Sequence, residues 1–165
     1  MIKIIATLLT LFAFNVSHAK VNVGIILGFT GPIETLTPGM SAGAELAFNE
    51  AADSGKLLNG QSINIIKVDS TCVDSAAATS AAESLISQGV TAIMGADCSG
   101  VTGAVLSNVA VPNGVPMISP SATSPGLTTA ADNGLFFRTA PSDARGGEVL
   151  ADITLSRGIS SVAIT

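Results

Sequence analysis

Residues 90–125 read VTAIMGADCSGVTGAVLSNVAVPNGVPMISPSATSP, and two short apolar runs within them each end in small polar residues. Such runs, bounded by glycine and proline, are typical of buried strands, and the segment between them has the length and pattern of a helix. The expected elements are a strand at Val90–Met94, a turn at Gly95–Cys98, an N-cap at Ser99, a helix at Val101–Val111 and a second strand at Gly114–Ser119.

The two polar clusters are expected to lie on one edge of the sheet. Two parallel strands joined by a helix bring their carboxyl ends together, and open α/β sheets bind ligands at that edge. Asp97-Cys98-Ser99 follows the first strand, and Ser119–Ser124 follows the second. The Ser99 hydroxyl and the N–H groups of a helix N-terminus suit a carboxylate, whereas the hydroxyls and carbonyls of the second cluster suit an ammonium group.

The rest of the chain alternates strand and helix in the same way. Thr37-Pro38 begins a predicted helix that Asp53-Ser54-Gly55 ends, Asn59-Gly60 marks a turn, and Asp74 caps a helix that runs to Gln88. Further strands are expected at Lys20–Leu27, Ile63–Val68, Leu135–Thr139 and Ser161–Thr165, and a last helix at Ser142–Arg157. This order predicts an α/β fold, in which a parallel sheet carries helices on both faces and is wound like a Rossmann fold.

Residues 1–19 have the pattern of a signal peptide. Lys3 precedes an apolar run at Ile4–Phe14, and Ser17-His18-Ala19 is a small-x-small cleavage site, so the mature chain is expected to begin at Lys20. The apolar run is too short to span a bilayer, and the residue directly after the cleavage site is Lys20 rather than a cysteine that could carry a lipid. The alternative is a buried helix.

The charge and composition of the mature chain exclude several functions. Removing Lys3 leaves six basic and twelve acidic residues, which disfavours nucleic acid as a partner. His18 is the single histidine and leaves with the leader, and Tyr and Trp are absent, so the commonest general base and metal ligand is missing. We therefore predict no metal and no catalytic residue.

Cys72 and Cys98 are the two cysteines, and each falls in the loop after a predicted parallel strand. A disulfide between them is the favoured prediction, and closing this loop contributes about 3.5 kcal/mol in the chain-entropy model. A pair of buried free thiols and a metal site are the alternatives, although two cysteines without histidine make a poor metal site.

Two motifs of enzymes are incomplete in this chain. Gly95–Gly100 has the two-glycine frame of a phosphate-binding loop, but Val101 stands where the lysine is required. A Gly-x-Ser-x-Gly elbow is also absent.

The polar residues near the sheet edge have ordinary structural readings as well. Ser99, Ser121 and Thr123 are also compatible with cap and turn positions. Asp97 is predicted to meet a ligand amine, whereas Glu34 fits a solvated surface position and Asp69 a loop-capping one.

The motifs taken together identify a family resemblance. They are VGIILGFTGP (23–32), GAELA (43–47), DSTCVD (69–74), IMGADCS (93–99) and MISPSATSP (117–125). In this order, and with the cysteine pair, they resemble the periplasmic substrate-binding proteins of type I fold, in the branched-chain amino acid (Leu/Ile/Val-binding) group that serves ABC transporters. The resemblance covers Val21–Thr165.

In that family the residue after the second cysteine and a Pro-x-Ala-Thr loop bind the carboxylate and ammonium of the ligand. The resemblance therefore implies ligand contacts at Ser99, Ser121, Ala122 and Thr123, and it also implies the Cys72–Cys98 disulfide. Relatives often place an aromatic ring over the ligand where Leu36 stands here. The ligand class is therefore left open among amino acids, amides and small acids.

The resemblance also implies an organisation and partners. Residues 20–139 would form lobe 1 of a two-lobed receptor, and residues 140–165 a hinge crossing and the start of lobe 2. The last predicted helix and strand form an unfinished βαβ unit, so we expect the front part of a longer chain. A monomeric periplasmic receptor without cofactor is expected, which binds a small molecule and meets an ABC permease. The alternatives are the ligand-sensing ectodomain of a receptor, or a secreted Rossmann-like hydrolase whose catalytic residues lie further along.

Overall fold

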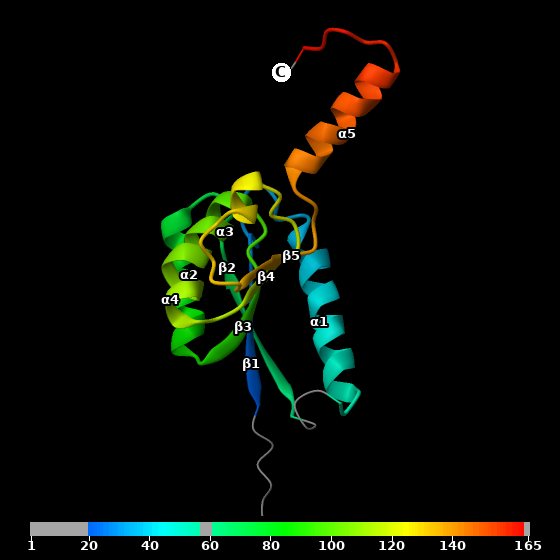
Figure 1. The fold of residues 1–165 in the computed structure, drawn as a ribbon. Helices are drawn as coiled ribbons and strands as arrows, with labels where there is room; N and C mark the ends of the chain where they lie inside the picture. The colour runs from blue at the N-terminus through cyan, green and yellow to red at the C-terminus, as the bar shows by residue number, and fades with distance from the viewer. Residues whose placement is uncertain (1–19, 57–60, 164–165) are drawn as a thin grey trace, which may run out of the picture.

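The computed structural model describes residues 20–56 and 61–163 and contains a five-stranded sheet, all of whose pairs are parallel (Figure 1). The strands lie in the order β2-β1-β3-β4-β5. Their bounds are β1 Val21–Leu27, β2 Ile63–Asp69, β3 Val90–Gly95, β4 Met117–Ser119 and β5 Phe136–Arg138. The parallel sheet predicted from the alternation of elements is confirmed.

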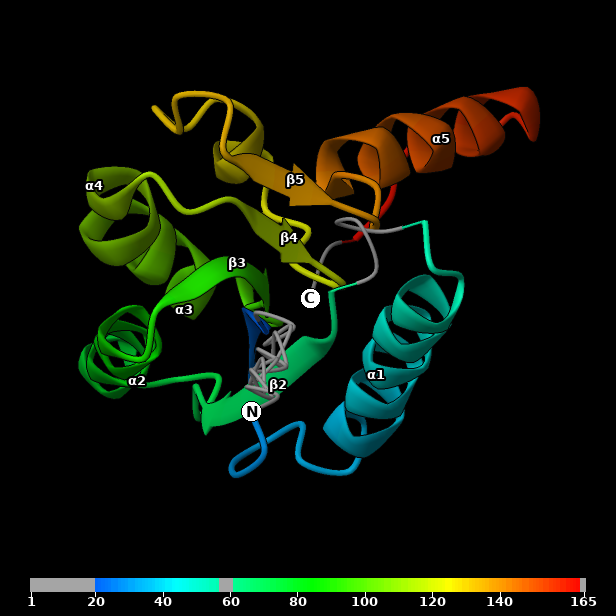
Figure 2. The same ribbon diagram turned by 90° about the horizontal axis from the view of Figure 1, so that it is seen from below.

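Helices connect the strands and cover both faces of the sheet. Figure 2 shows α1 on one side and α2, α3 and α4 on the other. The bounds are α1 Thr37–Asp53, α2 Ser75–Ser87, α3 Ser99–Val105, the π-helical turn η2 Leu106–Ala110, α4 Val111–Asn113, the 3-10 turn η3 Pro125–Thr128 and α5 Asp143–Ser156. α5 extends away from the sheet (Figure 1).

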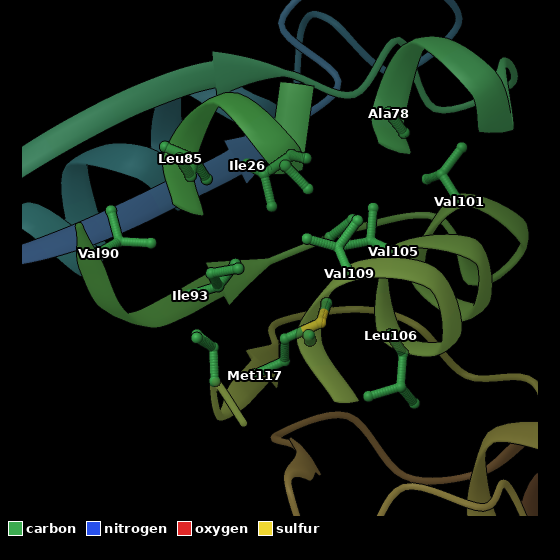
Figure 3. Packing of buried hydrophobic residues seen from close by; sticks show 14 residues of the cluster. Ile26, Ala78, Leu85, Val90, Ile93, Val101, Val105, Leu106, Val109 and Met117 are labelled. Carbon is green, nitrogen blue, oxygen red and sulfur yellow. The ribbon is translucent and has the colours of Figure 1, made fainter. Parts of the chain in front are cut away.

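The main core lies between the sheet and the α2 and α3 helices. The lack of a side chain on Gly24 of β1 lets Leu85 of α2 pack closely on the sheet, because a Cβ on Gly24 would lie 2.6 Å from Leu85 Cδ1. Figure 3 shows Leu85 beside Ile26, with Val101 and Val105 of α3 completing the cluster. These side chains are at most 1% exposed, and burial of this kind contributes about 1.5 to 3 kcal/mol per large residue.

The ends of α2 follow from its sequence. Asp74 is the N-cap, as predicted, and its carboxylate accepts hydrogen bonds from the N–H groups of Ala76 and Ala77 at 2.9 and 3.0 Å. Gly89 follows the helix with a φ of 71°, a left-handed conformation that favours glycine.

The structure corrects several predicted boundaries. The helix expected at Val101–Val111 runs from Ser99 to Asn113 and includes the π-helical turn, so Cys98 rather than Ser99 occupies the N-cap position. β4 begins at Met117 rather than Gly114, because Gly114 ends the helix in a left-handed conformation and Pro116 has no N–H for a ladder.

The strand predicted at Ser161–Thr165 is the larger error. Ser161–Ala163 are not in a strand, since the sheet ends at β5. Residues 164–165, the signal peptide predicted at 1–19 and the Asn59-Gly60 turn lie outside the described residues.

Gly95 at the end of β3 should tolerate no side chain. Its φ is 123°, and a Cβ there would lie 2.0 Å from the carbonyl oxygen of Ile26 on β1. Gly95→Ala should lower the free energy of unfolding by more than about 3 kcal/mol, measured by urea denaturation. The control is Gly43→Ala on α1, where the added Cβ would have nothing within 4 Å. This substitution should raise the free energy of unfolding by up to about 1 kcal/mol. Parental stability in Gly95→Ala would contradict this packing.

Candidate ligand-binding site

The loops after β3 and β4 lie side by side at the carboxyl edge of the sheet, as predicted. The Ser121 hydroxyl donates to the carbonyl oxygen of Asp97 at 3.0 Å, and the N–H of Ser124 donates to Ser99 Oγ at 3.1 Å. The Ser119 hydroxyl donates to the carbonyl of Ala96 at 2.5 Å. Three contacts therefore join two loops about 25 residues apart in sequence.

The hydroxyls at this edge differ in whether they can donate a hydrogen bond to a ligand or accept one from it. Ser121 and Thr123 each donate their proton within the protein, the first to Asp97 and the second to the carboxylate of Asp143 at 2.9 Å. Their oxygens then present lone pairs, which accept. Ser99 is the reverse case, because its oxygen accepts from Ser124 and its proton is given to no other described residue.

Ala122 is buried, and its backbone groups are already paired. Its N–H donates to Ser119 Oγ at 3.0 Å, and its carbonyl accepts from the Arg138 guanidinium at 3.2 Å. Arg138 also donates to the carbonyl of Ser124 at 2.9 Å and to the Thr128 hydroxyl. Sequence reasoning missed Arg138 as the residue that holds this loop.

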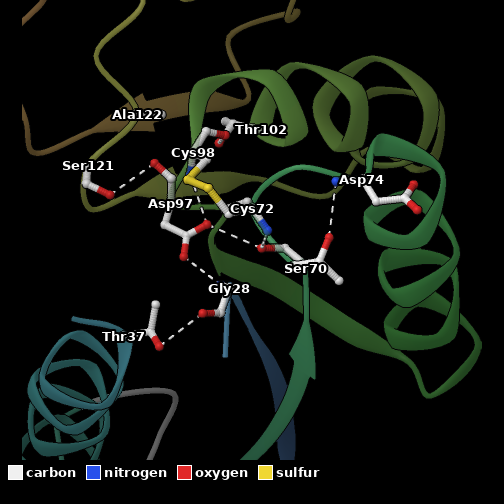
Figure 4. Close-up of a disulfide and its surroundings, with 12 residues drawn as sticks. Gly28, Thr37, Ser70, Cys72, Asp74, Asp97, Cys98, Thr102, Ser121 and Ala122 are labelled. Carbon is white, nitrogen blue, oxygen red and sulfur yellow. Dashed lines mark hydrogen bonds between the residues drawn. A yellow bond between two sulfur atoms is a disulfide. The ribbon is translucent and has the colours of Figure 1, made fainter. Parts of the chain in front are cut away.

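The side chain of Asp97 is buried, contrary to the prediction. We expected it to meet a ligand amine, but its side chain is 2% exposed and accepts hydrogen bonds from the protein (Figure 4). The donors are the N–H of Gly28 at 2.6 Å, the N–H of Cys98 at 2.9 Å and the Ser70 hydroxyl at 3.2 Å. Asp97 therefore joins the loops after β1, β2 and β3.

The predicted disulfide joins two of these loops. Cys72 and Cys98 are bonded, with their Cα atoms 5.2 Å apart and a separation of 26 in sequence number. Figure 4 shows the bond beside Asp97 and Ser70. The covalent link and the carboxylate thus hold the ends of β2 and β3 together.

Asp69 caps a loop, as predicted. Its carboxylate accepts from the Thr30 hydroxyl at 2.5 Å and from the N–H of Thr71 at 2.8 Å. Burial raises the pKa of the Asp69 carboxyl, but the hydrogen bonds from Thr30 and Thr71 outweigh it, so the pKa lies below its ordinary value. Asp69 therefore joins the loops after β1 and β2.

Leu36 and Glu34 lie on the exposed loop between β1 and α1. Leu36 is 58% exposed and precedes the first residue of α1, and Glu34 is exposed as expected. The loop is fixed to the edge through Gly28, whose carbonyl accepts from the Thr37 hydroxyl at 3.2 Å. Leu36 thus stands on a loop that is anchored beside Asp97.

Neither a metal cluster nor a membrane span is found within residues 20–56 and 61–163. Histidine, cysteine and carboxylate side chains there form no group of three that could hold a metal ion. None of the described helices is long and apolar enough to cross a bilayer.

Comparison with known proteins identifies the family. A family model described as periplasmic binding protein matches residues 20–165. The chain belongs to this family. The Leu/Ile/Val-binding protein BraC3 of Rhizobium johnstonii is 31% identical over 151 residues, which are 91% of this chain and 40% of that relative. The chain thus spans about two fifths of the length of that relative.

Solved structures of this kind share the fold. The substrate binding protein LivJ of Streptococcus pneumoniae, in complex with isoleucine, is 31% identical with a TM-score of 0.67 over 76% of this chain and 35% of that one. A solute binding protein of an ABC transporter from R. palustris, in complex with benzoate, is 28% identical with a TM-score of 0.71 over 85% and 38%. Family members of similar likeness therefore hold ligands of different chemistry.

The disulfide predicts that the purified chain has no reactive thiol. Labelling with a maleimide in denaturant should attach no label without reductant and two labels after reduction, as counted by mass spectrometry. Cys72→Ser should free its partner and attach one label without reductant. Two labels on the unreduced parent protein would contradict the disulfide.

The lowered pKa of Asp69 predicts a pH-dependent contribution to stability. A carboxylate with a lowered folded-state pKa stabilises the fold above its unfolded pKa of about 3.9, and this contribution is lost as pH falls through the folded pKa. Asp69→Asn should therefore be less stable than the parent at pH 7, and the difference should shrink below about pH 4. Urea denaturation at several pH values measures it.

Asp152→Asn is the control for the Asp69 measurement. It removes the same charge from an exposed position on α5, where we expect little change in stability at either pH. A stability difference for Asp69→Asn that is the same at pH 7 and pH 3 would show that its carboxylate charge is not what caps the loop.

Proposed function

We propose that this chain is the ligand-binding front part of an extracytoplasmic solute receptor, which binds a small amino acid or a related small acid or amide and delivers it to an ABC permease. The receptor is not an enzyme. It binds its ligand at the edge formed by Ser99, Ser121, Ala122 and Thr123, with Leu36 on the adjoining loop.

The donor or acceptor character of the three hydroxyls is the observation that carries this proposal. Ser99 has a proton to donate, which suits a carboxylate, and it stands in the first turn of a helical segment where backbone N–H groups are free. Ser121 and Thr123 offer lone pairs, which suit an ammonium group. A ligand with both groups, such as an amino acid, satisfies all three.

The relatives support the transport role. LivJ is named as the substrate binding protein of a branched-chain amino acid transporter and the benzoate-binding protein as that of an ABC transporter, and this chain shares their fold at 31% and 28% identity. A receptor of this kind meets a permease in the membrane after it has bound its solute. We further propose that the mature protein is a periplasmic monomer that begins at Lys20.

The division of the chain follows from the same proposal. Residues 20–139 form lobe 1 and include the whole five-stranded sheet, and residues 140–165 form a hinge crossing and the start of lobe 2. The extension of α5 away from the sheet supports this division (Figure 1). The apolar side chains of Leu150 and Leu155 are 66% and 71% exposed on α5, as expected of a helix whose packing partner lies elsewhere.

The site is tested by removing its hydroxyls in the polypeptide encoded by the complete gene. Ser99→Ala and Thr123→Ala should each weaken binding of L-leucine about 10- to 100-fold in calorimetry, because a hydrogen bond to a charged group contributes about 1.5 to 3 kcal/mol. Ser107→Ala is the control, since this exposed hydroxyl bonds only within its own helix. Unchanged affinity in both variants would remove these residues from the site.

The receptor function itself is tested with a panel of the amino acids, small amides and aromatic acids. At least one of them should bind with a dissociation constant in the micromolar range or below. A folded protein that binds no member of the panel would contradict the proposed function.

A further inference from the structure

Asp97 forms no ion pair with any of the residues that the structure describes. The ion pairs formed within the described part of the chain are Lys67 with Glu45 and Arg145 with Glu148, and neither includes Asp97. Arg138, at the end of β5, donates to two carbonyls and a hydroxyl instead. Burying a charge without a cation is expensive, so its presence needs a reason.

The Asp97 carboxylate is held by hydrogen bonds from three loops. All three groups that contact its carboxyl oxygens are donors: the N–H of Gly28, the N–H of Cys98 and the Ser70 hydroxyl. These three hydrogen bonds hold the carboxylate in place behind the edge.

We propose that Asp97 is a specificity-determining residue, whose buried carboxylate selects ligands that carry an ammonium group over ligands that are purely anionic. This inference rests on the proposed function and assigns a role to a residue that does not touch the ligand. Asp97 is linked directly to the site because its own carbonyl accepts from the Ser121 hydroxyl at 3.0 Å. The lone pairs of Ser121 and the charge of Asp97 then attract the same group.

The size of the effect follows from the distance. For a ligand charge that contacts Ser121, a separation of roughly 10 Å from the carboxylate and an effective dielectric constant of about 20 would give an attraction equivalent to about tenfold in affinity. The other carboxylates of this edge are Asp69, which faces Thr30 and Thr71, and Asp143, which faces Thr123. They add to the negative potential, and the Arg138 guanidinium opposes it.

The test compares L-leucine with two of its fragments in the polypeptide encoded by the complete gene. The fragment 4-methylpentanoate lacks the ammonium group, and isopentylamine lacks the carboxylate. In Asp97→Asn, the ratio of the dissociation constant of 4-methylpentanoate to that of leucine should fall about tenfold, as measured by calorimetry. A purely structural role would weaken both ligands by one factor and leave the ratio unchanged.

Ser70→Ala is the matched control, because it removes one donor from the carboxylate and keeps the charge. Its ratio should equal that of the parent. Should Asp97→Asn not fold, Asp97→Ser is measured in its place, and its ratio should fall in the same way.

Two results would overturn the inference. The first is an unchanged ratio in a folded neutral variant while leucine still binds, which leaves the receptor function intact. The second is a parent protein that binds none of the three compounds, which removes leucine-like ligands together with this inference.

Discussion

The carboxyl ends of four neighbouring strands meet at Asp97. Its side chain accepts from the loops that follow β1, β2 and β3, and its carbonyl accepts from the loop that follows β4. In a parallel sheet, successive strands end in irregular loops at the same edge, and the backbone groups of those loops need hydrogen-bond partners. A carboxylate has about four lone-pair directions, so one residue can satisfy donors from several loops at once. The geometry of the candidate site depends on that arrangement.

The regular part of this architecture was predictable from the sequence. Alternating apolar runs and helical segments predicted the parallel sheet, and its topology alone predicted that Ser99 and Ser121 would lie near each other. The Asp74 cap and the disulfide were also predictable, since both follow from residue types at particular places in the chain. Each of these predictions uses information that is local or is fixed by strand order.

The contacts that shape the site were less predictable because they depend on distant backbone groups. Gly28 is 69 residues from Asp97, and a glycine N–H has no sequence signature that marks it as the partner of a buried carboxylate. Burial of an unpaired charge also contradicts the usual expectation for aspartate at a strand end. Arg138 was missed for a similar reason, since its partners are carbonyls 14 and 16 residues away. The last predicted strand failed because a strand needs a neighbour, and β5 ends the sheet.

The bond between Thr123 and Asp143 connects the binding edge to α5. Asp143 lies in the first turn of α5, and its N–H in turn donates to the carbonyl of Thr123 at 3.0 Å. A ligand group that donates to the Thr123 oxygen leaves this pair intact, whereas one that takes the Thr123 proton must displace Asp143. In the proposed site, a ligand that contacts Thr123 is therefore coupled to the position of α5. By thermodynamic reciprocity, a displacement of α5 away from Thr123 would then change ligand affinity by the same factor by which the ligand changes the equilibrium of that displacement.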